Sequence, residues 1–145
     1  MTSWQTMKPG PELRRIIAQR IGWHMRKVYV GSQGIEYDFI VYDNDDRMIY
    51  LREIKPEDLQ DEEATTHAVW LEAMKNEDSP RWDEDVDDAL WIIDQTPYSV
   101  QHTNGQFNAW VGEAAYTGSA EAEALALMRA WLTWTDHHPT GFSED

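Results

Sequence analysis

Hydrophobic and polar residues recur with two different periods along the chain, and each change of period marks a new element. The first apolar residues recur at helical spacing, namely Leu13, Ile16, Ile17 and Ile21. Pro11 lies just before them and Gly22 just after them. Proline is tolerated in the first turn of a helix and glycine commonly ends one, so the pattern predicts a helix over residues 11–21.

The period changes to two between residues 26 and 54, where β-branched and aromatic residues dominate. Three such runs are separated by turn-forming residues, namely VYV at 28–30, IEYDFIVY at 35–42 and MIYLREI at 48–54. Alternation of this kind is typical of half-buried strands. The pattern predicts three antiparallel strands, the last two joined in a hairpin by the acidic turn at 43–46.

The middle of the chain is acidic, and its apolar positions predict two helices. We interpret residues 56–80 as an acidic insertion or mobile arm. It contains one amphipathic helix, since four apolar residues keep roughly helical spacing, namely Ala64, Ala68, Leu71 and Met74. Acidic residues at 83–85 then precede a second apolar stripe, formed by Val86, Ala89, Leu90 and Ile93. Acids favour the start of a helix, so this stripe predicts a helix that ends near Gln95.

The last third of the chain returns to period two and then to helical spacing. Residues 97–103 and 106–116 flank Asn104-Gly105, a dipeptide typical of tight hairpin turns, and are predicted strands. Gly118 and Ser119 are predicted to cap a final helix. Its apolar face is formed by Leu125, Leu127, Met128, Trp131 and Leu132. Residues 135–145 are predicted to be a frayed tail.

These elements predict an α+β fold with an antiparallel sheet of about five strands between helices, an α/β/α sandwich. The 145 residues are 41% hydrophobic, which suits a single domain over residues 1–145. No run approaches the roughly 18 apolar residues of a membrane helix, and the first residues lack a secretory signal core. We therefore expect a cytoplasmic protein without a membrane partner. The absence of cysteine excludes disulfides, thiolate zinc sites and a cysteine nucleophile.

The net charge of the chain limits the classes of partner that it can bind. There are 27 acidic residues against 12 basic ones, a formal charge of −15 that repels nucleic acid at long range. The acids at helix starts are explained by folding, whereas the acids between Asp43 and Asp78 are not. We therefore predict an acidic binding face for a protein with a basic surface, formed by Asp43, Asp45, Asp46, Glu57, Asp58, Asp61, Glu62 and Glu63.

Four stretches together resemble a known family. They are WQTMKPGPELRRIIAQRIGW near the start, SPRWDEDVDDALWIID, FNAWVGEAAYTG, and the closing SAEAEALALMRAWL. The chain resembles the phage ABA sandwich domain proteins over about half its length. The resemblance implies a sheet between helix layers, a phage origin and a location in the host cytoplasm, but no catalytic motif and no site residues. The chain departs from the family in a longer, more acidic stretch at 28–78, and in Leu127-Met128-Arg129, where a cysteine often precedes the arginine.

An enzymatic alternative rests on Asp38 in one predicted strand and on Glu53 and Lys55 in the next. This spacing resembles the Asp, Glu-x-Lys core of restriction-endonuclease-like nucleases. Two carboxylates can hold a divalent metal, and a lysine two residues past the glutamate projects from the same face of the strand. An upstream helical Glu12 or Gln19 would fit the same order. Net acidity argues against this alternative, because a nuclease needs a basic surface for its substrate.

A second alternative is a sponge that sequesters a nucleotide signal of host defence in a pocket between subunits. Phosphates favour arginine, and five cations cluster in the sequence near the first helix and strand, namely Arg14, Arg15, Arg20, Arg26 and Lys27. A homo-oligomer would be anchored by tryptophans near element ends, namely Trp4, Trp23, Trp70 and Trp82. Trp91, Trp110 and Trp131 lie within predicted elements and are predicted to be core.

We predict from these patterns a non-catalytic accessory protein, encoded by a phage. It would inhibit or modulate a host defence system through its acidic surface, in the manner of a DNA mimic. The sequence predicts no cofactor and no resident metal. The nucleotide sponge and the metal-dependent nuclease remain the alternatives.

Overall fold

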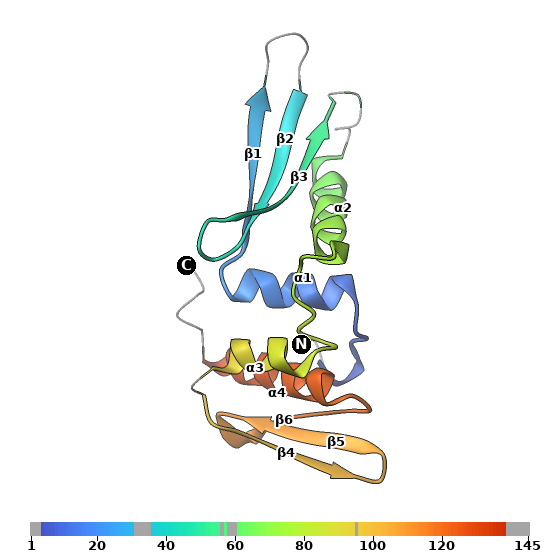
Figure 1. Ribbon diagram of the computed structural model, residues 1–145, viewed down its shortest axis with the longest axis vertical. Helices are drawn as coiled ribbons and strands as arrows, with labels where there is room; N and C mark the ends of the chain where they lie inside the picture. Colours follow the sequence, from blue (N-terminus) through green and yellow to red (C-terminus); the bar gives the residue numbers. More distant parts are fainter. Residues whose placement is uncertain (1–3, 31–35, 56, 58–60, 95, 139–145) are drawn as a thin grey trace.

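The computed structural model describes residues 4–30, 36–55, 57, 61–94 and 96–138, and within these ranges the protein is α+β. Figure 1 shows an elongated molecule with a sheet near each end and helices between them. The elements are η1 (Trp4–Thr6), α1 (Pro11–Arg20), β1 (His24–Val30), β2 (Glu36–Tyr42), β3 (Met48–Ile54), α2 (Glu62–Lys75), α3 (Val86–Ile93), β4 (Tyr98–Thr103), β5 (Gln106–Val111), β6 (Glu113–Ala120) and α4 (Glu123–His137).

The strands form two separate antiparallel sheets in place of the single sheet of about five strands that the sequence predicts. Strands β1, β2 and β3 make the N-terminal sheet, and β4, β5 and β6 make the C-terminal sheet. Helix α1 crosses the molecule between α2 on one side and α3 and α4 on the other (Figure 1). The helices therefore separate the two sheets, and each sheet packs on its own helix.

One face of the N-terminal sheet is covered by α2. Phe39 and Val41 of β2 and Ile54 of β3 are buried on that face. Helix α2 contributes four buried residues, namely Val69, Trp70, Ala73 and Met74. The 56–80 stretch, predicted as an insertion or mobile arm, thus includes a helix whose apolar side belongs to the core. Residues 56 and 58–60 of that stretch lie outside the described residues.

Acidic side chains start two of the helices. Asp61 accepts a hydrogen bond from the Ala64 amide at 3.1 Å and caps α2. Asp85 accepts from the amides of Asp87 and Asp88 at 2.9 and 3.3 Å and caps α3. Both caps satisfy amides that have no partner inside the helix.

The C-terminal sheet has one strand more than predicted, because Gly112 divides residues 106–116. Its φ of +77° suits glycine, and its amide bonds to the Pro97 carbonyl at 2.7 Å. Gly118 and Ser119 lie in β6 and do not cap α4, which begins at Glu123. A Cβ on Gly118 would lie 2.4 Å from the Ala130 amide nitrogen, so this glycine permits close contact between strand and helix.

The tryptophans largely reverse their predicted roles. Trp131 is buried as predicted, but Trp91 is 57% exposed, because Ala89, Ile92 and Ile93 form the buried side of α3. The predicted surface anchors all belong to the core, namely Trp4, Trp23, Trp70 and Trp82. Trp4, Trp23 and Trp82 lie near element ends, whereas Trp70 lies within α2. The predicted basis for an oligomer is therefore lost.

The end of α4 extends into the predicted tail. The helix continues through His137, so residues 135–137 are helical, and residues 139–145 lie outside the described residues. None of the described helices combines the length and the apolar composition needed to cross a bilayer.

Candidate functional site

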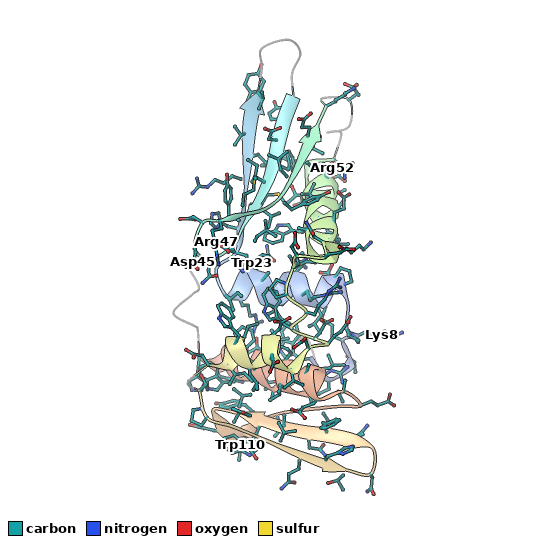
Figure 2. The ribbon with its side chains drawn as sticks, viewed as in Figure 1. Lys8, Trp23, Asp45, Arg47, Arg52 and Trp110 are labelled. Carbon is teal, nitrogen blue, oxygen red and sulfur yellow. The ribbon has the colours of Figure 1, made fainter. Side chains whose placement is uncertain are left out.

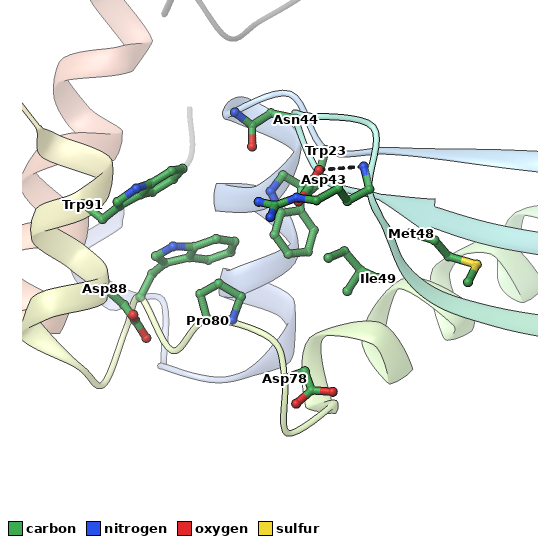
Figure 3. A pocket seen from close by; sticks show the side chains of 11 residues that line it. Trp23, Asp43, Asn44, Met48, Ile49, Asp78, Pro80, Asp88 and Trp91 are labelled. Atoms are coloured by element: carbon green, nitrogen blue, oxygen red, sulfur yellow. Dashed lines mark hydrogen bonds and ion pairs between the residues drawn. The ribbon is translucent and has the colours of Figure 1, made fainter.

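A hollow of about 500 Å³ lies between the start of β3 and α3, and we name it the waist pocket. Met48 and Ile49 line it from the start of β3, Asp88 and Trp91 line it from α3, and Pro80 lies in the loop before α3 (Figure 3). Its walls thus come from segments about 40 residues apart in the sequence. A depression of this size, built by both parts of the molecule, is the kind of place where proteins bind ligands or partner side chains.

Indole rings form much of the pocket wall. Trp23 and Trp82 pack edge to face, with ring centroids 5.3 Å apart and planes at 75°. Trp82 is only 1% exposed, so this pair is a fixed part of the core beneath the pocket. Trp91 is 57% exposed and can be reached from solvent. Asp88 lies three residues before it on α3, a spacing that places both side chains on one side of the helix.

Asp43 is the most buried acid of the pocket, and it organises the β2–β3 turn. Its carboxylate accepts hydrogen bonds from the amides of Asp45 and Arg47, each at 2.9 Å. The Arg47 Nε also donates to it at 3.1 Å. Asp46 has a φ of +62° in the same turn. Asp43 is therefore committed to holding the turn, and an arriving ligand must use other carboxylates.

Two further carboxylates are placed to receive a ligand. Asp88 accepts one hydrogen bond, from the Arg81 amide at 2.8 Å, through a single oxygen. Asp78 is exposed at the edge of the pocket, and Figure 3 shows it on the side away from Asn44. The described lining residues include three carboxylates and one guanidinium, that of Arg47, which gives a formal charge of −2. The pocket therefore favours a cationic ligand.

A buried ion pair lies close to the waist pocket and joins α1 to the segment before α3. Arg14 Nε lies 3.5 Å from Asp83 Oδ1, and the two side chains are 4% and 0% exposed. The Gly10 amide donates to Asp83 Oδ2 at 2.6 Å. Burial raises the pKa of Asp83, and the charge of Arg14 and the Gly10 hydrogen bond oppose that rise. Arg14 is thus a structural residue and not part of an open cation cluster.

The predicted acidic face is divided between the two ends of β3. Asp43, Asp45 and Asp46 lie in the turn before the strand, whereas Glu57 and residues 61–63 lie beyond its other end (Figure 1). Seven residues of strand at about 3.3 Å each put roughly 20 Å between the two groups. Asp58 lies outside the described residues. Only the turn group adjoins the waist pocket.

The predicted nuclease residues are partly brought together. Asp38 and Glu53 are direct cross-strand partners in β2 and β3. Lys55 is exposed just past the end of β3. The described part of the chain holds no group of three or more histidine, aspartate or glutamate side chains arranged to bind a metal ion. Glu12, on α1, forms ion pairs with Arg15 and His67.

The five predicted phosphate-binding cations each have a separate partner. Arg15 pairs with Glu12, and Arg20 pairs with Asp136 at 2.8 Å. The Arg26 guanidinium lies 5.2 Å from the centre of the Tyr42 ring, and Lys27 pairs with Glu62 at 2.5 Å. Two of them, Arg15 and Lys27, line one hollow of about 300 Å³, but Glu62 and Glu63 line it as well. They do not form one cationic pocket within the chain.

Sequence reasoning missed most of the waist pocket. Of its acids only Asp43 was predicted to bind, and Trp91 was assigned to the core. The signal that could have found it is the segment RWDEDVDDALW, in which two tryptophans enclose five acids. Such a run exceeds what a helix start requires.

Comparisons with protein families, with curated proteins and with solved structures find no match to this chain. The likeness to the phage ABA sandwich proteins therefore stays a prediction. What the protein binds has to be argued from its own residues.

Proposed function

We propose that this protein is a non-catalytic binding protein whose waist pocket receives a basic segment of a partner protein. The observation that carries the proposal is the pocket itself, where the exposed indole of Trp91 and the carboxylates of Asp78 and Asp88 line a hollow of about 500 Å³. The described lining contains no serine, cysteine, histidine or lysine, so its aspartates are the only side chains there of the kinds commonly used for nucleophilic and acid–base catalysis. These features favour recognition over reaction.

Arginine is the partner side chain that this pocket suits best. A planar guanidinium can stack on the face of Trp91 while its N–H groups donate to Asp88, and Asp78, across Pro80 in Figure 3, can accept from a second basic side chain. Charge-assisted hydrogen bonds of this kind are stronger than neutral ones. The exposed acids Asp45 and Asp46 of the nearby turn would attract further basic residues of the same segment. A partner protein with a basic surface, including one that handles nucleic acid, would meet these requirements.

Arg47 opposes the proposed ligand. Its guanidinium lines the pocket and is 75% exposed, held by Asp43 at 3.1 Å and Asp45 at 3.6 Å. An arriving arginine would experience repulsion from it. Removing this charge by Arg47→Gln should therefore strengthen the binding of a basic peptide. The increase should be smaller if the peptide binds to the acidic surface in general and not to this pocket.

Calorimetric titration with a short arginine-rich peptide tests the proposal. We expect binding that weakens as salt rises. The double substitution Asp78→Asn with Asp88→Asn should weaken it roughly tenfold, because each carboxylate contributes on the order of 1 kcal/mol or less at a partly exposed site. Trp91→Ala should weaken it by a similar factor through loss of the stacking surface.

The matched control neutralises two exposed acids beside the C-terminal sheet, Glu113→Gln with Glu121→Gln. It changes the net charge by the same amount as the pocket variant. Equal loss of affinity in the two double variants would mean that net charge alone attracts the peptide. No binding at low salt would refute the proposed function.

A further inference from the structure

The N-terminal sheet has a second face that α2 does not cover, and we name it the open face. Because side chains alternate along a strand, Ile40 of β2 points away from the α2 side occupied by Phe39 and Val41. Val28 and Val30 are each 42% exposed and Leu51 is 39% exposed on that face. Figure 1 draws α2 as the helix alongside this sheet. Apolar side chains of this number on one uncovered sheet face are typical of an interaction surface.

The charges of the open face are divided between its strands. The side chain of Arg26 comes from β1, at one edge of the sheet. The carboxylates of Asp38 and Glu53 come from β2 and β3, and β3 is the opposite edge. The guanidinium of Arg26 lies over the Tyr42 ring on the same face, 5.2 Å from its centre. The β1 edge is therefore basic, whereas the carboxylates lie on the central strand β2 and on the β3 edge, among apolar residues.

We propose that the open face binds a second copy of this chain. In a pair related by a two-fold axis parallel to the strands, β1 of one copy lies over β3 of the other. This arrangement places Ile40 against Ile40 and Arg26 over Leu51 of the second copy, twice. Glu53 of the second copy lies two residues further along β3, about 7 Å away, a distance that the long arginine side chain can span. Two-fold dimers require such self-complementary surfaces.

The overall charge of the chain supports the choice of this face. At −15 per chain, two copies repel each other over most of their surfaces. The described side chains of the open face include one cation and two carboxylates among apolar residues, so repulsion is weak there. A different acidic protein would likewise be repelled by the rest of the surface. A strongly basic partner would bind more favourably to the acidic β2–β3 turn than to the open face.

The size of the open face sets the strength of the pair. Three strands of seven residues span about 23 Å by 14 Å, or roughly 300 Å² per copy. Stable complexes commonly bury about 800 Å² per partner. The dimer is therefore expected to be weak, and to form as the protein concentration rises from about 10 μM to 1 mM.

Sedimentation velocity of the full chain over that range tests the proposal, in about 0.3 M salt to screen long-range repulsion. We expect a concentration-dependent dimer. Leu51→Glu should weaken it at least about tenfold, since it buries a charge against apolar residues. The control Tyr98→Glu alters an equally accessible apolar residue, 43% exposed on the C-terminal sheet, and should leave the dimer unchanged.

A charge exchange makes the geometry specific. Arg26→Glu should weaken the dimer, and Arg26→Glu combined with Glu53→Arg should restore it, with circular dichroism checking that each variant folds. A monomer at every concentration would overturn the proposal, as would a dimer that survives Leu51→Glu or one that Tyr98→Glu abolishes. Binding of the arginine-rich peptide to the waist pocket is measured separately, so the two proposals can fail independently.

Discussion

The two sheets pack on their helices in different ways. In the C-terminal part, nine of the 15 residues of α4 are buried, and Gly118 of β6 allows the strand to approach the backbone of Ala126 and Ala130. In the N-terminal part, only four of the 14 residues of α2 are buried. Glu72 of α2 instead accepts hydrogen bonds from Tyr50 at 2.7 Å and Arg52 at 2.6 Å.

This difference indicates which part of the molecule has surface available for binding. Small residues in close contact make the C-terminal sheet and α4 a rigid base, because interiors packed to this density tolerate little change. The N-terminal sheet is held partly by polar contacts at the edge of α2 and leaves apolar side chains exposed. Both proposed binding surfaces, the waist pocket and the open face, involve the N-terminal sheet.

The largest expected effect concerns the buried Arg14–Asp83 ion pair, which connects α1 to the segment before α3. Arg14→Met leaves Asp83 as a buried carboxylate without its cation, which typically costs about 3–5 kcal/mol of the free energy of unfolding at neutral pH. Because Arg14 is on α1 and Asp83 precedes α3, both sheets should lose stability together. Hydrogen exchange of β2 and β5 amides in the variant checks this. Loss of protection in one sheet alone would mean that the halves are independent.

The cost of Arg14→Met should depend on pH. Burial raises the pKa of Asp83 above its ordinary value of 3.8, and removing Arg14 raises that pKa further. A raised pKa in the folded state gives stability that is present below the unfolded pKa and is lost as the pH rises through the folded one. Urea denaturation should therefore show a small difference between the variant and the parent below about pH 4 and a large one at pH 7. A cost independent of pH would contradict this role of Asp83.

The next effect tests the close packing of the C-terminal part. Gly118→Ala places a Cβ 2.4 Å from the Ala130 amide nitrogen and 2.5 Å from the Ala126 carbonyl oxygen, both backbone atoms. Such overpacking should cost about 1–3 kcal/mol or more. Gly105→Ala is the matched control, because its Cβ meets nothing within 4 Å and its φ of +76° costs about 1 kcal/mol. Equal thermal shifts in the two variants would remove the claim of a close-packed base.

The smallest effect tests the polar attachment of α2. Glu72→Ala removes the acceptor of both Tyr50 and Arg52 at half-buried positions, and should cost about 1–2 kcal/mol. The hydrogen bond to Glu72 and, to a lesser extent, burial raise the pKa of Tyr50 above 10.0. Its contribution to stability is thus lost as the pH rises through that raised pKa. Ultraviolet titration should show a tyrosine that ionises at lower pH in the variant; an unchanged titration curve would contradict the contact.

Local patterns were sufficient to predict most elements but not how they assemble. The helix at 11–21 and the strands around 28–30, 35–42 and 48–54 correspond to α1 and β1–β3. The final strand was missed because Gly112 turns the chain through a positive φ inside an otherwise continuous run. Gly118 matched a helix cap in sequence, whereas its function is contact with a helix that follows it. Alternation within a strand also does not reveal whether two hairpins share a sheet.

The candidate site depends on contacts that sequence patterns do not contain. Trp82 and Trp23 are 59 positions apart and bury each other. Arg14 looked like one of five neighbouring cations until Asp83, far along the chain, proved to be its partner. The buried side of α3 was ambiguous over eight residues, so Trp91 was placed inside. Asp38 opposite Glu53 was within reach of the sequence, because hairpin register follows from alternation.

The most direct test of the central claim follows the indole N–H signals of the eight tryptophans by NMR while an arginine-rich peptide is added. The waist pocket predicts that the signal of Trp91 shifts most, with smaller changes at Trp23 and Trp82. Trp110, on the C-terminal sheet and labelled far from the pocket in Figure 2, should remain unchanged. Equal shifts at Trp110 and Trp91, or no shift at Trp91 when calorimetry shows binding, would contradict the assignment of the waist pocket as the binding site.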